Sequence, residues 1–233
     1  MDASVWSGGS LSTDRSSVSS GLVAALSSAA DAEPVLLRVR REAHLFRAGD
    51  EFSALYSVHS GSFKVVSADG CGVEQIVDFS MLGELFGCDG IGTGRHQCTA
   101  TALEDSCVTV LPFSSLEALA RRSVAKQRQL LAALSLEIVR KNGMLVLLGS
   151  MTADRRLATF LVNLSQRLRQ QGYSPTDFIL RMTREEIGSY LGLNLETVSR
   201  SFSRFEQRGL LSVEGKHVQI LRYETLLSEA ASL

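Results

Sequence analysis

The sequence predicts an α+β protein with a β-barrel or sandwich first, a long helix next and a winged helix-turn-helix last. Two patterns carry this prediction: short β-like runs broken by turns up to Pro112, and helical periodicity after it. A third is the stretch 183–209, in which two helical patterns meet at a glycine. We expect four regions: a flexible Ser-rich segment (1–34), a β domain (35–123), a dimerisation helix (124–150) and a winged helix-turn-helix domain (151–233).

Composition fits a protein of two compact domains. The chain has 233 residues, is 45% apolar and carries a net charge of −1. Residues 151–233 hold 11 basic and 9 acidic side chains, an excess too small to indicate DNA binding by itself. No apolar run approaches the ~20 residues of a membrane span, and the first residues do not resemble a secretion signal. We therefore expect a cytoplasmic protein with reduced thiols and no membrane partner.

The β domain is predicted from alternating runs and turn residues. A hairpin turn at 69–72 joins a strand at 62–66 to its returning partner at 74–79, and residues 99–111 supply the last two strands. Further runs lie at 35–39, 44–46 and 54–61.

The helix expected at 124–150 carries apolar residues at heptad spacing. The seam alternates steps of four and three residues and consists of Leu134, Ile138, Lys141, Leu145 and Leu148. Such a seam is typical of a helix that pairs with a second helix. Because it spans only about three heptads, a face packed on the chain's own core stays open as an alternative. Lys141 weakens pairing at its position but can fix its register.

Other helices and a hairpin complete the C-terminal half. Ser114 or Ser115, with Glu117, predicts the start of a short helix, and Thr152 or Asp154 that of a helix ending at Gln171. A loop with a short strand is expected at 173–181, a hairpin wing at 210–221 and a terminal helix at 223–231.

The stretch 183–209 has the features of a helix-turn-helix. Thr183 and Glu186 form a capping-box pattern at the start of the first helix. Gly192 permits a left-handed turn, and Gly188 leaves room where two helices cross. The second helix, 195–208, has the apolar stripe Val198, Phe202 and Phe205.

The opposite face of that second helix is polar. It carries Glu196, Ser199, Arg200, Ser201 and Arg204. An apolar back with short polar and arginine side chains in front is suited to a DNA major groove. The competing interpretation is a helical hairpin with a solvated face; the glycines and Val198 at the packing position favour DNA binding.

These motifs closely resemble the cAMP-receptor-protein superfamily, in particular its FNR/FixK branch (fumarate–nitrate reduction regulator), over about residues 35–225. The resemblance lies in four signatures: 46–50, 55–61, 83–87 and 182–200. It implies a cyclic-nucleotide-binding-like β-roll as sensor-like domain, a long dimerisation helix and a C-terminal winged helix-turn-helix. It also implies a homodimeric transcription regulator that binds double-stranded DNA and contacts RNA polymerase.

The resemblance assigns DNA-reading roles on the second helix. Glu196, Ser199 and Arg200 match the Glu-x-x-Ser-Arg pattern that reads bases in the FNR type. Arginine can bond guanine at O6 and N7, and glutamate can accept from cytosine N4. Leu195 replaces the arginine of the cAMP-receptor type, so we expect a TTGAT-N4-ATCAA-like palindrome. Thr183, Arg184 and Arg204 are expected to contact phosphates, which position without specifying.

The cyclic-nucleotide cassette of the family is degenerate here. Gly83 and Gly87 align with its upstream glycines, which places Cys88 at the ribose-binding Glu and His96 at the phosphate-binding Arg. In the other register Glu84 and Arg95 stand in for them. We expect no cyclic nucleotide.

An FNR-type [4Fe–4S] cluster is also disfavoured. Such clusters use three clustered N-terminal cysteines and one in the barrel, whereas residues 1–70 contain no cysteine and the barrel position is Thr109. The cysteines, at 71, 88, 98 and 107, have no metal-site spacing, so no metal is expected. Cys71, at a Gly-Cys-Gly turn, is a candidate redox thiol.

The favoured hypothesis is therefore a DNA-binding regulator that needs no bound cofactor. The alternative is an effector- or redox-gated regulator, with a nucleotide, a haem or a modified thiol in the β-roll. An enzyme is disfavoured, because the sequence has no nucleophile–base pattern, metal-ligand spacing or phosphate loop in context. The signal, the target genes and the choice between activation and repression stay open.

Overall fold

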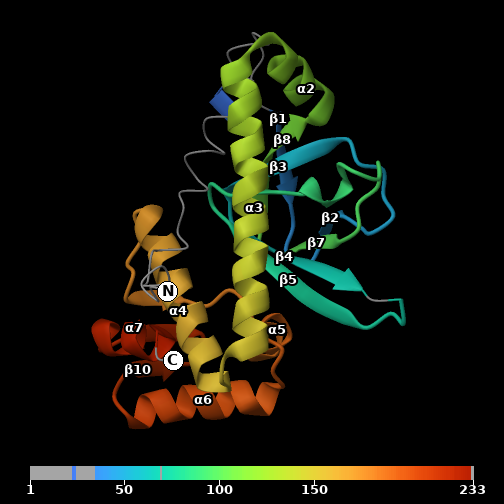
Figure 1. The fold of residues 1–233 in the computed structure, drawn as a ribbon. Coiled ribbons are helices and arrows are strands. Elements are labelled where there is room, and N and C mark those ends of the chain that lie inside the picture. The colour runs from blue at the N-terminus through green and yellow to red at the C-terminus, as the bar shows by residue number, and fades with distance from the viewer. Residues whose placement is uncertain (1–22, 25–34, 69, 232–233) are drawn as a thin grey trace, which may run out of the picture. The chain divides into compact units, whose positions relative to one another are not determined.

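The structure is a computed structural model that describes residues 23–24, 35–68 and 70–231. The segment predicted to be flexible, 1–34, lies outside the described residues except at two positions. The chain forms two compact units that divide between Ile138 and Val139, within one long helix (Figure 1). This division differs from the four regions expected from the sequence, in which the helix stood alone.

The first unit contains two four-stranded antiparallel sheets, in the orders β1-β8-β3-β6 and β2-β7-β4-β5 (Figure 1). The strands run Val35–Val39 (β1), His44–Phe46 (β2), Ala54–Ser60 (β3), Ser62–Ala68 (β4), Glu74–Met81 (β5), Leu85–Phe86 (β6), Thr99–Ala102 (β7) and Ser106–Pro112 (β8). The expected hairpin and the last two strands are confirmed. A 3-10 turn, η2 (Cys88–Gly90), follows β6.

Both sheets contribute to one core. Phe46, Phe63 and Val65 from one sheet lie in the same cluster as Val58 and Phe86 from the other, and Phe63 is fully buried. Burial of this apolar surface stabilises the β-roll. Gly61, at φ +81°, permits the sharp reversal between β3 and β4, where a side chain would collide with Ser106.

Two helices follow the β-roll. Helix α2 (Phe113–Arg122) begins directly after β8, so that Pro112 occupies its N-cap without a side-chain hydrogen bond. The prediction that Ser114 or Ser115 starts this helix is therefore wrong: the strand leads directly into the helix, whose N-cap lies two residues before Ser114. Helix α3 (Val124–Ser150) has the predicted bounds.

The second unit contains the rest of α3 and the C-terminal elements. These are α4 (Ala153–Gln170), β9 (Asp177–Ile179), α5 (Arg184–Leu191), α6 (Leu195–Gln207), β10 (Leu211–Glu214), β11 (His217–Ile220) and α7 (Tyr223–Ala231). Thr152 caps α4, as one of the two expected starts. The predicted wing is a three-stranded sheet in the order β10-β11-β9. The sequence predicted each strand but not that β9 joins the wing.

Candidate nucleic-acid interface

Helix α5 begins with the predicted capping box. The Thr183 hydroxyl oxygen accepts a hydrogen bond from the Glu186 backbone N–H (3.1 Å), and the Glu186 carboxylate accepts one from the Thr183 N–H (2.7 Å). Each bond satisfies a backbone donor that the first turn of a helix leaves without a partner. The start of the helix-turn-helix is thus fixed by local sequence.

The turn between α5 and α6 depends on two glycines. Gly192 has φ +62°, the left-handed conformation that favours glycine. A Cβ atom at Gly188 would lie only 2.6 Å from the carbonyl oxygen of Leu193. The two helices can therefore approach closely only because residue 188 has no side chain, as the sequence predicted.

The back of α6 is buried as expected, with one correction. Val198, Phe202 and Phe205 have no exposed surface. Ser201 was predicted on the outer polar face, but it is fully buried and its hydroxyl accepts a hydrogen bond from Arg204 (2.9 Å). A small hydroxyl can occupy the packed face because this arginine satisfies it.

The outer face of α6 presents an ion pair. The Arg200 guanidinium and the Glu196 carboxylate, one helical turn apart, lie 2.5 Å apart, and both side chains are 69% exposed. Ser199 is half-buried beside them and Leu195 is exposed. The structure thus brings together the three residues expected to read bases; their contact with bases stays a prediction.

The residues expected to contact phosphates have partners within the protein. The Arg204 guanidinium binds the Asp154 carboxylate at the start of α4, with its Nε 2.8 Å from Oδ2. This hydrogen bond lowers the pKa of Asp154 and raises that of Arg204. The Arg184 guanidinium carbon lies 4.2 Å from the Phe202 ring centre, and burial lowers the pKa of this arginine. A phosphate role for Thr183, Arg184 and Arg204 stays a prediction.

A further polar group lies on the wing. The Asp177 carboxylate of β9 accepts a hydrogen bond from Gln219 (2.9 Å) and lies 2.6 Å from the His217 ring nitrogen of β11. The His217 contact, followed by that of Gln219, lowers the pKa of Asp177. These contacts hold β9 to the wing, and sequence analysis did not anticipate them.

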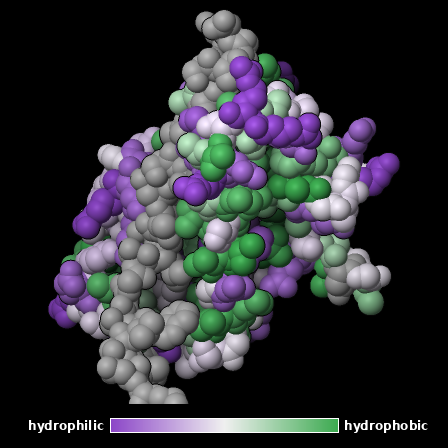
Figure 2. Space-filling model, turned by 45° about the horizontal axis from the view of Figure 1, so that its top comes forward, coloured by the Kyte–Doolittle hydropathy of each residue, from purple (hydrophilic) through white to green (hydrophobic). Residues whose placement is uncertain are grey.

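Helix α3 exposes much of the predicted heptad seam, and Figure 2 shows apolar side chains gathered where this helix runs. Ile138 is 61% and Leu145 67% exposed, Lys141 is also exposed, and Leu134 and Leu148 are half-buried. The exposed apolar residues Leu131 and Val124 continue the seam toward the start of the helix at seven-residue spacing. Sequence reasoning missed both, although the same spacing would have found them.

In the β-roll, the residues that align with the family's cyclic-nucleotide motif make their polar contacts within the protein. The Glu84 carboxylate is 4% exposed and accepts from the Met81 N–H (2.9 Å), and the Arg95 guanidinium donates to the Gly49 carbonyl (2.7 Å). His96 is buried and stacks on Phe46, with ring centres 3.7 Å apart.

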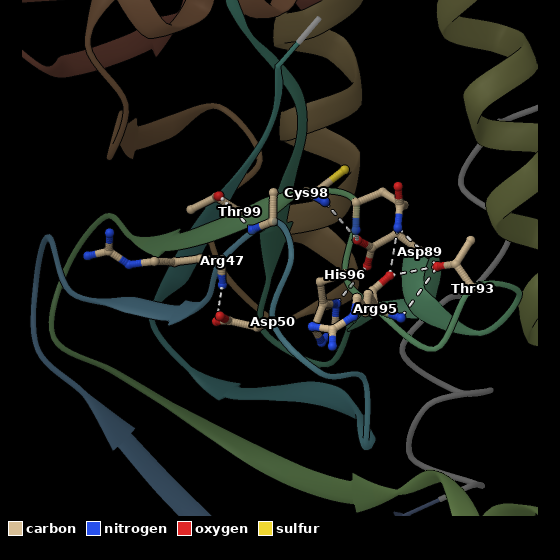
Figure 3. A network of polar contacts seen from close by, with 10 residues as sticks. Arg47, Asp50, Asp89, Thr93, Arg95, His96, Cys98 and Thr99 are labelled. Carbon is tan, nitrogen blue, oxygen red and sulfur yellow. Dashed lines mark hydrogen bonds and ion pairs between the residues drawn. The ribbon is translucent and has the colours of Figure 1, made fainter. Parts of the chain in front are cut away.

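Asp89 organises the loop that carries His96. One of its carboxylate oxygens lies 3.1 Å from the His96 ring nitrogen, and the other accepts from the backbone N–H groups of Gln97 and Cys98 (Figure 3). Three contacts to one carboxylate fix the loop from η2 to β7. Sequence analysis noted His96 but missed Asp89, for which a spacing of seven residues gives no recognisable motif.

All four cysteines lie within the described residues, and none is in a disulfide. Cys71 is exposed at the tip of the β4–β5 hairpin, as its position in a Gly-Cys-Gly turn predicted, and the other three are partly buried. A redox role for Cys71 stays a prediction. Within the part of the chain that the structure describes, no helix combines the length and apolarity that crossing a bilayer requires.

Known families match both units. A model described as a Crp-like helix-turn-helix domain matches residues 155–229, and one described as a cyclic nucleotide-binding domain matches residues 36–123. The chain is 48% identical over 177 residues to the transcriptional activator protein Anr of Pseudomonas protegens, a match covering 76% of this chain and 72% of that protein. The chain belongs to the CRP/FNR family of transcription regulators.

Other relatives agree with this membership. The fumarate and nitrate reduction regulatory protein of Escherichia coli (strain K12) is 43% identical over 182 residues, 78% of this chain and 73% of that protein. The solved structure of FixK2 from Bradyrhizobium japonicum has a TM-score of 0.78 at 29% identity, covering 87% of this chain and 100% of that chain. The expected fold is confirmed: a cyclic-nucleotide-binding-like β-roll, a long helix and a C-terminal helix-turn-helix. The protein is a DNA-binding transcription regulator of the Anr/FNR/FixK type.

Proposed function

We propose that this CRP/FNR-family protein acts as a homodimeric transcription activator that reads a TTGAT-N4-ATCAA-like palindrome and needs no bound cofactor. One observation carries the proposal: Glu196 and Arg200 stand exposed and paired on a helix whose opposite face is fully buried. The activating role is proposed by analogy with the relative Anr, a transcriptional activator protein.

Base reading follows from the chemistry of that pair. The guanidinium of Arg200 has donors to spare for guanine O6 and N7, and Glu196 can accept from the N4 amino group of a neighbouring cytosine. Their ion pair orients both side chains before DNA arrives, which lowers the ordering cost of binding. Ser199 is close enough along the helix to contact an adjacent base edge.

Phosphate binding requires some rearrangement. Arg204 bonds to Asp154, so we propose that it positions α6 from within the protein and adds a phosphate contact through its remaining donors. Arg184, stacked on Phe202, is held at the start of α5, where the backbone N–H groups also favour an anion. Thr183 has its hydroxyl oxygen in the capping box, and its O–H is available to donate.

Dimerisation is proposed through the exposed seam of α3. A second copy of this helix would bury Leu131, Ile138 and Leu145, which a monomer leaves more than half exposed. Burying such side chains is favourable by about 25 cal/mol per Å² of apolar surface. Two recognition helices would then enter successive major grooves about 34 Å apart. RNA polymerase is the expected protein partner of the DNA-bound dimer.

The β-roll does not fit a cyclic nucleotide. A ribose would need a carboxylate directed into the site, but Glu84 is buried against the Met81 N–H. A phosphate would need a guanidinium, but Arg95 bonds to Gly49, and the adjacent position holds the ring of His96, which stacks on Phe46. The sequence positions of the four cysteines equally argue against an FNR-type cluster. We therefore propose that neither cofactor is required.

Selection from a pool of randomised duplexes tests the function. We expect the wild-type protein to enrich an inverted repeat of TTGAT-like half-sites, and Arg200→Ala to lose preference at the guanine by about 1–3 kcal/mol per half-site. Gln207→Ala, which removes another exposed side chain from α6, should weaken all sequences alike or none. Unchanged sequence preference in Arg200→Ala would refute the assignment.

Native mass spectrometry of the purified protein tests the cofactor-free state. We expect the mass of two chains with no bound nucleotide, haem or iron–sulfur species. A stoichiometric ligand would instead support the effector-gated alternative, and DNA binding by Cys71→Ser that no longer responds to oxidant would support a redox gate.

A further inference from the structure

The first turn of α4 holds an arginine that bonds to three separate parts of the second unit. The Arg156 guanidinium donates to the carbonyl oxygens of Leu148 (2.7 Å), Met151 (3.0 Å) and Leu191 (2.9 Å). Leu148 belongs to the last turn of α3, Met151 to the connection between α3 and α4, and Leu191 is the last residue of α5. All three acceptors are backbone atoms.

Two of these acceptors are carbonyl oxygens at the C-terminal ends of helices. The last four carbonyls of a helix have no partner within the helix, and they carry the negative end of its dipole. Leu148 and Leu191 supply such carbonyls from two different helices. The planar guanidinium, with five donors in a fixed fork, can serve both helix ends at once.

A second contact places the turn of the helix-turn-helix against the end of α3. A Cβ atom added at Gly192 would lie 3.2 Å from the Leu148 side chain and 3.4 Å from the Arg156 guanidinium. The backbone of the turn therefore packs directly on both. The turn is also where α5 and α6 meet, so its position sets the position of α6.

We propose that Arg156 is a positioning residue that fixes the recognition helix, α6, relative to the end of the dimerisation helix, α3. It thereby sets the spacing between the two half-sites. This inference rests on the proposed homodimer. In a dimer joined along α3, the distance between two recognition helices is defined only if each is held rigidly to its own α3. The Arg156 guanidinium donates to three backbone carbonyls of its own unit, so we expect it to govern the spacer and not the half-site sequence.

Fluorescence-anisotropy titrations of the full-length protein test this inference. The probes are a single selected half-site and palindromes whose spacer is the selected length or is one or two base pairs shorter or longer. We expect wild type to favour one spacer strongly. Arg156→Ala should bind the single half-site as wild type does, but its preference for that spacer should fall about tenfold, because a loosely held pair of helices loses effective concentration.

Two variants at the start of α4 sharpen the result. Arg155→Ala, which loses only a bond from its Nε to the Ala230 carbonyl (3.1 Å) in α7, should keep the wild-type spacer profile. Arg156→Lys keeps the charge but not the fork, so it should fold and show a partly relaxed profile. If Arg156→Ala melts at a lower temperature than wild type, the spacer profile of Arg156→Lys decides the test.

The outcomes separate this inference from the proposed function. A wild-type spacer preference that Arg156→Ala and Arg156→Lys both retain would overturn the positioning role alone. The same holds if the variants lose half-site and palindrome binding in equal proportion, since that would indicate general damage to the domain. If the wild-type protein showed no spacer preference, both the proposed homodimeric binding to a palindrome and the positioning role of Arg156 would be overturned.

Discussion

The recognition helix and the β-roll use their charged side chains in opposite ways. On α6, the side chains of Glu196 and Arg200 are each 69% exposed, and the Arg200 guanidinium pairs with the Glu196 carboxylate. In the β-roll, Glu84 is 4% exposed and its carboxylate accepts from the Met81 N–H, and the Arg95 guanidinium donates to the Gly49 carbonyl. The first arrangement presents donors and acceptors to a partner, whereas the second satisfies them internally.

Under the proposed function, the helix-turn-helix binds DNA and the β-roll serves as a scaffold that needs no ligand. A buried polar group must find a partner in the protein when it has none in a ligand. Asp89 meets that need for the loop before β7 by accepting from two backbone N–H groups and contacting His96. We expect substitutions in the two regions to have separable effects.

The largest expected effect is on the helix-turn-helix. Gly188→Ala places a Cβ atom 2.6 Å from the Leu193 carbonyl oxygen, a backbone atom that cannot move alone. We expect the free energy of unfolding of the second unit to fall by roughly 1–3 kcal/mol and DNA binding to be lost, with no change in the β-roll. Calorimetric unfolding and DNA titration measure both. Gly92→Ala, with nothing within 4 Å of its Cβ, is the control that should change neither.

A matched effect is expected in the β-roll. His96→Ala removes a buried ring that stacks on Phe46 and contacts Asp89, so the β-roll should lose about 2 kcal/mol of stability. Sequence preference in DNA selection should not change, because the reader makes its own contacts. If His96→Ala instead altered sequence preference with the fold intact, the β-roll would be more than a scaffold.

An intermediate effect concerns dimerisation. Lys141→Leu places an apolar side chain at an exposed position of the seam, and we expect tighter dimers by on the order of 1 kcal/mol in sedimentation velocity. Lys141→Gln removes the charge without adding apolar surface and should have a smaller effect. A weaker dimer in Lys141→Leu would exclude this face of α3 as the interface.

Local sequence patterns were sufficient to predict most of the helix-turn-helix and the order of helices and strands. The capping box at Thr183, the left-handed turn at Gly192 and the crossing at Gly188 each depend on residues within ten positions of one another, so spacing alone reveals them. The bounds of α3 followed from helical periodicity in the same way.

The failures have physical reasons. Ser201 lies three residues after Val198 and four before Phe205, a spacing that places it on the buried face of the helix. The prediction assigned it to the surface because its side chain is polar. Contacts that join distant segments left no pattern at all: Arg156 with Leu191, Arg204 with Asp154 and Arg95 with Gly49 are set by tertiary packing.

The smallest expected effect is a pH dependence that only the second unit should show. The hydrogen bond from Arg204 lowers the pKa of Asp154 in the folded state. Folding therefore gains stability from this pair above the ordinary pKa of an aspartate, and the gain is lost as the pH falls through the lowered value. Because the Arg204 side chain is exposed and that of Asp154 is 32% exposed, solvent screening keeps the gain below about 1 kcal/mol.

Asp154→Asn should therefore leave the melting temperature of the β-roll unchanged at every pH and lower that of the second unit slightly near neutral pH. The difference from wild type should shrink as the pH falls through the lowered pKa of Asp154, where the wild-type carboxylate also becomes protonated. Thermal melts at a series of pH values measure this convergence. A difference that stayed constant with pH would exclude the charge of Asp154, and with it the Arg204 pair, as the source of the effect.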